Sequence, residues 1–218
     1  MTRLKGIPLA HPWIRRVTLL CASLVLLGVL ASPAAARPRP DQHSCESRNG
    51  VVIFQRGSAR CTTDGTSYAK ATGRGAQAVA RYGSTATAEG KGAQADAGDG
   101  STATATGVGS FAGASGGGTA TATGDGSAAT AHVGVASANG TNSRAQAVDP
   151  GSNAYASGAN SHAVAVNGGQ AKADGDNSFA HAGGTGSSAS ASGDGSSATA
   201  IGNCSISAGP GETLSCTG

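Results

Sequence analysis

The sequence predicts an all-β protein, an Ala/Gly-rich parallel β-roll in which each coil of about 17 residues holds two strands. Three observations support this fold class: a repeated x-Ala-x-Ala block, a constant spacing of the blocks, and Gly-rich connectors between them. One set of blocks recurs every 17 residues and a second set follows it nine residues later. The first set starts at Tyr68, Thr85, Thr102 and Thr119, and the second at Gln77, Gln94, Phe111 and Ala128.

Each block is expected to form a strand of about five residues. Side chains alternate between the two faces of a strand, so both Ala of a block share one face. The Ala faces of the two strands in a coil must meet, and methyl groups allow two sheets to approach more closely than the usual ~10 Å. Large aliphatic residues are scarce after Phe54, so an ordinary hydrophobic core is excluded.

Composition alone leaves disorder as an alternative. The chain has 36 Gly in 218 residues and only 3% aromatic residues, which is also typical of low-complexity secreted chains. Compositional bias by itself would not preserve a 17-residue period over so many blocks, so the regular spacing favours the ordered roll.

The connectors have the form Gly-x-(Gly/Asn)-(Ser/Ala), for example GDGS at 98–101 and GDNS at 175–178. Gly and Asn adopt a positive φ at low cost, as a tight corner requires. A strand, a corner, a second strand and a second corner complete one coil.

The N-terminal segment 1–36 is predicted to be a signal peptide. Basic residues precede an apolar run at 17–30, and the sequence at 34–36 offers a small-residue cleavage site. The run is shorter than the ~20 residues that a membrane span needs. We therefore expect a secreted protein, extracellular or in the cell envelope, with no transmembrane segment after cleavage.

Three further regions follow. Residues 37–66 are expected to be a lead-in and a hairpin cap with Val51–Phe54 as its strand, 67–203 the β-roll, and 204–218 a C-terminal cap. Four cysteines remain after cleavage, and an even number in an exported chain indicates disulfides. Of the three connectivities, we predict the local one, which closes each end of the repeat: Cys45 with Cys61 and Cys204 with Cys216. No C-x-x-C motif suggests zinc.

Charge argues against nucleic acid as a partner. Residues 37–82 carry eight basic and three acidic groups, whereas 83–203 carry three basic and eight acidic. A nucleic-acid surface would need a basic groove with interleaved aromatic residues, and the repeat is acidic.

The outward positions of the two strand sets differ. The first set carries Thr columns that could order water as an ice-binding surface does, although Glu89 interrupts the edge of the array. These columns are Thr85, Thr102, Thr119 and Thr87, Thr104, Thr121. The second set carries apolar residues, and we expect Phe111, Val164 and Phe179 to form a self-association face.

The corners and Ala pairs resemble the head repeat of YadA-type trimeric autotransporter adhesins, which has GDNS-like corners such as Gly175-Asp176-Asn177-Ser178 here. The resemblance covers roughly 67–208 and implies a left-handed parallel β-roll with three chains side by side. Unlike that family, the blocks are eight or nine rather than about seven residues apart, and no heptad stalk or membrane-anchoring strands are recognisable. The layout is also similar to that of small secreted actinobacterial proteins.

The sequence predicts a non-catalytic structural or adhesive protein without cofactor or metal. No arrangement supplies a nucleophile with a positioned base. The Gly-Asp corners lack the large aliphatic residue that calcium-binding nonapeptides carry in register. The expected partners are further copies of the chain, as a trimer or another homo-oligomer, and an extracellular matrix or surface ligand; an ice surface is the alternative.

Overall fold

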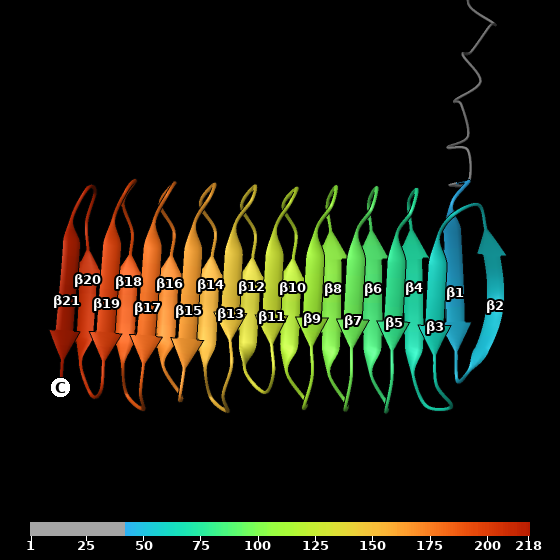
Figure 1. Ribbon diagram of the computed structural model, residues 1–218, viewed down its shortest axis with the longest axis horizontal. Coiled ribbons are helices and arrows are strands. Elements are labelled where there is room, and N and C mark those ends of the chain that lie inside the picture. The colour runs from blue at the N-terminus through green and yellow to red at the C-terminus, as the bar shows by residue number, and fades with distance from the viewer. Residues whose placement is uncertain (1–41) are drawn as a thin grey trace, which may run out of the picture. The chain divides into compact units, whose positions relative to one another are not determined.

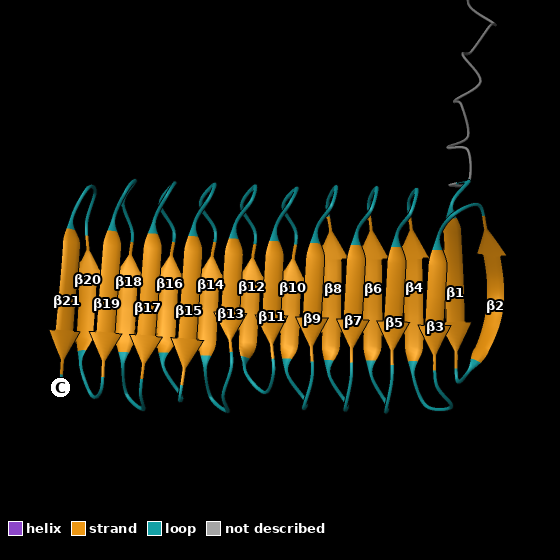
Figure 2. Cartoon of the chain, viewed as in Figure 1, coloured by secondary structure: helices purple, strands orange, loops and turns teal. Residues whose placement is uncertain are grey.

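A computed structural model describes residues 42–218 as a two-layer stack of β-strands without a helix (Figures 1 and 2). The predicted signal peptide and the start of the lead-in lie outside the described residues. One layer is an 11-stranded sheet, here the first sheet, and the other is a 10-stranded second sheet. The chain alternates between them, so each coil adds one strand to each sheet, and the predicted parallel β-roll is confirmed.

The first sheet contains β1 (Ser44–Arg48), β2 (Val51–Arg56), β4 (Tyr68–Thr72), β6 (Thr85–Glu89), β8 (Thr102–Thr106), β10 (Thr119–Ala122), β12 (Val135–Ala138), β14 (Asn153–Ala156), β16 (Gln170–Ala173), β18 (Ser188–Ala191) and β20 (Ser205–Ala208). The second sheet contains β3 (Arg60–Thr63), β5 (Gln77–Ala80), β7 (Gln94–Ala97), β9 (Phe111–Ala114), β11 (Ala128–Ala131), β13 (Arg144–Ala147), β15 (His162–Val166), β17 (Phe179–Gly183), β19 (Ser197–Ile201) and β21 (Thr213–Thr217).

Parallel pairing keeps alanine in register with alanine along both sheets. Ala86 pairs with Ala103 and Ala103 with Ala120 in the first sheet, and the second sheet repeats the pattern. Nearly all of these side chains are fully buried. Because each methyl group buries little apolar area, backbone hydrogen bonds between successive coils contribute much of the stability of the stack.

Sequence reasoning missed that serine shares the interior. A serine precedes many strands by one residue, two positions before the first alanine, so it has the same inward parity. Several of these buried serines donate their hydroxyl to the carbonyl three residues earlier, as Ser143 does to Gly140 at 2.7 Å and Ser161 to Gly158 at 2.7 Å, whereas Ser101 donates to the Ala114 carbonyl. The strict alternation of inward and outward side chains, extended one residue before each strand, could have revealed these buried serines in the sequence.

The two corners of a coil differ in variability. The first corner leads from the first sheet to the second, and its flanking alanines are always seven positions apart, as at Ala105 and Ala112. The second corner returns to the first sheet, and its flanking alanines are five residues apart at 131–136, six at 97–103 and seven at 147–154. All variation in coil length within the alanine repeat therefore falls in the second corner.

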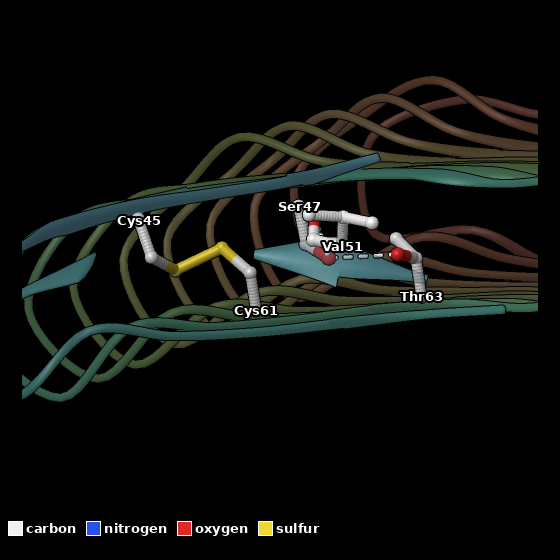
Figure 3. The surroundings of a disulfide bond; sticks show 5 residues. All are labelled: Cys45, Ser47, Val51, Cys61 and Thr63. Atoms are coloured by element: carbon white, nitrogen blue, oxygen red, sulfur yellow. Dashed lines mark hydrogen bonds between the residues drawn. A yellow bond between two sulfur atoms is a disulfide. The ribbon is translucent and has the colours of Figure 1, made fainter. Parts of the chain in front are cut away.

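The N-terminal end is closed by a hairpin. β1 pairs antiparallel with both β2 and β4, and its Cys45 and Ser47 take the inward positions that Ala71 and Ala69 hold in the next strand. Figure 3 shows the Cys45–Cys61 disulfide joining the two layers, with Val51 near Ser47 and Thr63. Ser47 donates to the Val51 carbonyl at 3.1 Å and shares a 2.7 Å hydrogen bond with Thr63.

The C-terminal end has the second predicted disulfide, Cys204–Cys216. Both pairings predicted from the sequence are thus confirmed. The sheets also extend past the range 67–203, because β3 lies before it and β20 and β21 lie after it. The cap segments supply strands to the same two sheets.

Candidate functional site

The Thr columns lie on the outer face of the first sheet, on β6, β8 and β10. Register places Thr85 beside Thr102 and Thr102 beside Thr119; Thr87, Thr104 and Thr121 form the parallel column. Strand geometry spaces the hydroxyls by about 4.8 Å between coils and about 6.7 Å along a strand. The sequence prediction of two aligned columns is therefore matched by the register.

The array has defined borders. Tyr68 and Lys70 flank it on β4, and Val135 and Ser137 flank it on β12. Glu89 lies in the adjacent column, beside Thr106. The regular Thr surface thus spans three coils and has the charged residues Lys70 and Glu89 at its margins.

The predicted self-association residues all lie on the second sheet but are not contiguous. Phe111 is on β9, Val164 on β15 and Phe179 on β17. Strands β11 and β13 separate Phe111 from the other two, and Arg144 stands in the same outward column as Phe111. The structure thus brings Val164 and Phe179 to neighbouring strands and leaves Phe111 apart.

A histidine is packed within this column. His162 lies between Arg144 and Phe179, and its ring meets Phe179 edge-on at a centroid distance of 5.5 Å. Its Nε2 is buried without a hydrogen-bond partner. Burial, and secondarily the Arg144 charge, lower the pKa of His162 below its usual value.

A shallow hollow of about 350 Å³ lies beside Phe111 on the second sheet. It arises because Gly113 has no side chain where its register neighbours are Asp96 and Thr130. Its remaining lining residues include Arg81, Tyr82, Asp99, Ser115 and His132.

The chemistry of this hollow is limited by geometry. Ser115 Oγ and His132 Nδ1 are 3.3 Å apart, but they occupy exposed second corners, and no described residue hydrogen-bonds the other imidazole nitrogen. A hydrolytic triad needs a third group that orients the histidine. Within residues 42–218, no group of three or more His, Cys, Asp or Glu side chains is close enough to hold a metal ion.

The Asp64 carboxyl group has a strongly lowered pKa. It accepts hydrogen bonds from the Ser67 hydroxyl, the Tyr82 backbone N–H and both donors of Thr66. These bonds lower the pKa of Asp64 from 3.8 to about 2. They also fasten Tyr82 of the next coil, which has a φ of 55° that is uncommon for a bulky residue.

Comparison with known proteins gives no relative for this chain. No family model matches it, and neither the curated proteins nor the solved structures contain a match. Among the described residues there is no helix long and apolar enough to cross a membrane.

Proposed function

We propose that the chain acts outside the cell as a non-catalytic structural rod that presents repeated faces to a surface ligand, in the manner of an adhesin head. The observation that carries this proposal is the uninterrupted register of two long parallel sheets, which repeats outward side chains from coil to coil. Repeat stacks commonly provide extended binding surfaces of this kind.

The two disulfides support the extracellular location. Such bonds persist in oxidising compartments and are rare in reducing ones. The resemblance of the corners to adhesin heads agrees with attachment, to extracellular matrix or to another surface.

The location and the attachment are tested separately. Protease added to intact producing cells should remove a C-terminally tagged chain that remains at the surface, while any released chain should appear in the medium. The purified chain should bind saturably to collagen, to fibronectin or to producing cells, and a reduced, heat-unfolded sample is the control. A tag protected inside cells would contradict the location, and no binding to any of these surfaces would contradict attachment.

Lateral self-association, as a trimer or another homo-oligomer, belongs to this proposal. Val164 and Phe179 on adjacent strands, with Phe111 further along the same sheet, would be covered by a neighbouring chain. Val164→Asp and Phe111→Asp should shift the sedimentation coefficient towards that of a monomer and lower the melting temperature. Thr104→Asp, on the first sheet, is the control. If it shifted the sedimentation coefficient as much as the two second-sheet variants do, this interface would be contradicted.

Ice binding is a second candidate function, favoured by the aligned Thr columns. A flat array of hydroxyls and methyl groups at regular spacing can hold ordered water. Concentrated protein should then show thermal hysteresis that Thr104→Tyr weakens, whereas Thr130→Tyr on the second sheet should leave it unchanged. Absence of hysteresis in the unmodified protein would remove this candidate.

A further inference from the structure

The N-terminal end of the stack exposes the largest run of apolar side chains in the described chain. Among residues 42–218, β2 pairs only with β1, and all six residues of β2 are exposed. Exposed fractions are 61% for Val51, 50% for Val52, 58% for Ile53 and 40% for Phe54. An edge strand with such a surface is a template for pairing with another chain.

The C-terminal end is also apolar and open. Ile206 and Leu214 occupy positions where the preceding coil has Ala189 and Ala198. Leu214 is 38% exposed, and no strand of residues 42–218 lies beyond β21 to cover it. The strands β20 and β21 end the two sheets, so their outer backbone groups have no ladder partner among residues 42–218.

Strand directions at the two ends are compatible. β2 is antiparallel to β1 and β1 is antiparallel to β4, so β2 runs in the same direction as β4 and β20. In the second sheet, β3 and β21 likewise run in the same direction. Figure 1 shows β2 at one end of the stack and β20 and β21 at the other. A second copy that continues the stack would therefore meet it with parallel strands, as every coil meets the next.

The charges at the ends are complementary. Residues 42–82 carry six basic groups and two acidic groups. Residues 173–218 carry four acidic groups, Asp174, Asp176, Asp194 and Glu212, and no lysine or arginine. Two N-terminal ends would repel each other, whereas an N-terminal end and a C-terminal end attract.

We propose that copies of this chain dock end to end, with the β2 end of one copy on the β20–β21 end of the next. The contact is heterologous and does not close on itself when the copies continue along one axis, so it builds an open filament. This inference deepens the proposed structural function by naming the partner, a second copy, and the two surfaces that meet.

Single-end variants of the full exported chain, with its disulfides intact, test the proposal. Ile53→Lys blocks the β2 end and Leu214→Lys blocks the β21 end; both side chains are exposed, so folding should persist and circular dichroism checks it. Sedimentation of the unmodified chain should show concentration-dependent oligomers. Each variant alone, carrying Val164→Asp and Phe111→Asp as well to prevent lateral association, should be monomeric, with end docking weakened roughly tenfold or more.

The decisive sample is an equimolar mixture of the two variants. Each retains one competent end, so head-to-tail docking predicts a dimer that contains one copy of each and grows no further. Raising the salt concentration should weaken it. Phe179→Lys, on the flank of the second sheet, is the matched control and should leave end docking unchanged.

Several results would overturn the proposal. One is a chain that stays monomeric at high concentration; another is a dimer that survives Leu214→Lys but not Ile53→Lys, which indicates pairing of two β2 ends. Oligomers lost only in Phe179→Lys indicate the lateral face instead. Assembly only after removal of residues 37–41 identifies that segment as the occupant of β2. Surface binding is measured independently, so failure of end docking is distinguishable from failure of the proposed function.

Discussion

Alanine methyl groups occupy most of the space between the two sheets, and this sets how the interior responds to substitution. Ala120 is fully buried on β10, with alanine on both neighbouring strands. Large side chains enter only near the ends, where cysteines, Ile206 and Leu214 replace alanine. The interior between the two sheets therefore has no room for larger side chains away from the ends.

Ala120→Leu is expected to lower the free energy of unfolding by about 2 kcal/mol or more, because a close-packed layer cannot accept three additional carbons without strain. Thr119→Leu, on the exposed side of the same strand, is the matched control and should change stability by less than about 0.5 kcal/mol. Urea unfolding measures both. Equal losses would show that the interior is not tightly packed.

The Asp64 carboxylate links two coils, and its titration should be visible in stability. Its pKa is lowered to about 2 by hydrogen bonds, so its contribution is complete above pH 4 and is lost as pH falls towards 2. Asp64→Asn should therefore lower the melting temperature at pH 7, and the difference from the unmodified chain should shrink between pH 4 and 2. A difference that is independent of pH in this range would contradict the assignment.

At the scale of the element, the two corners are under different constraints. In the first corner the leading glycines form a column in which each approaches the backbone of the next coil: Gly73, Gly90, Gly107, Gly124, Gly140, Gly158 and Gly175. A Cβ at any of these positions would collide with backbone atoms. This repeated close approach accounts for the constant length of the first corner, whereas in the second corner close approaches, such as that of Gly134 to Ser152, alternate with open positions such as Gly98.

Gly158→Ala should lower the free energy of unfolding by about 1–3 kcal/mol, because its Cβ would overlap the Gly175 carbonyl oxygen. Gly98→Ala is the control, since Gly98 lies in a second corner with no heavy atom near the added methyl group and no positive φ. Its stability should be unchanged or slightly raised. Chemical denaturation compares the two, and similar losses would argue against the glycine column.

At the scale of the whole molecule, one disulfide lies near each end of the stack. Each disulfide joins the first sheet or its preceding corner to the second sheet. Cys45 pairs in register with Ala71 and Cys61 with Ala78, so alanine fits both positions. Removing this disulfide should thus affect mainly the entropy of the unfolded chain, without leaving a poorly filled site.

The double substitution Cys45→Ala and Cys61→Ala is expected to lower the free energy of unfolding by about 3 kcal/mol, the value for a closed loop of ~15 residues. The sequence separation is 16 residues. Unfolding under non-reducing conditions measures the loss. The reduced unmodified chain is the comparison, and an unchanged stability would mean that the hairpin closes this end without the covalent bond.

The sequence by itself determined the coil. Period-two alternation placed the alanines inward, the 17-residue spacing predicted two strands per coil, and the cysteine positions predicted both disulfides, because these features are local and repeat. Only the tertiary structure decided which neighbours meet. Coil-to-coil register showed that Arg144 lies between Phe111 and Phe179 in one outward column, and that the first-corner glycines approach the next coil closely. The exposure of residues 51–54 was likewise invisible in the sequence, since it depends on β2 having a strand partner on one side only within the part of the chain that the structure describes.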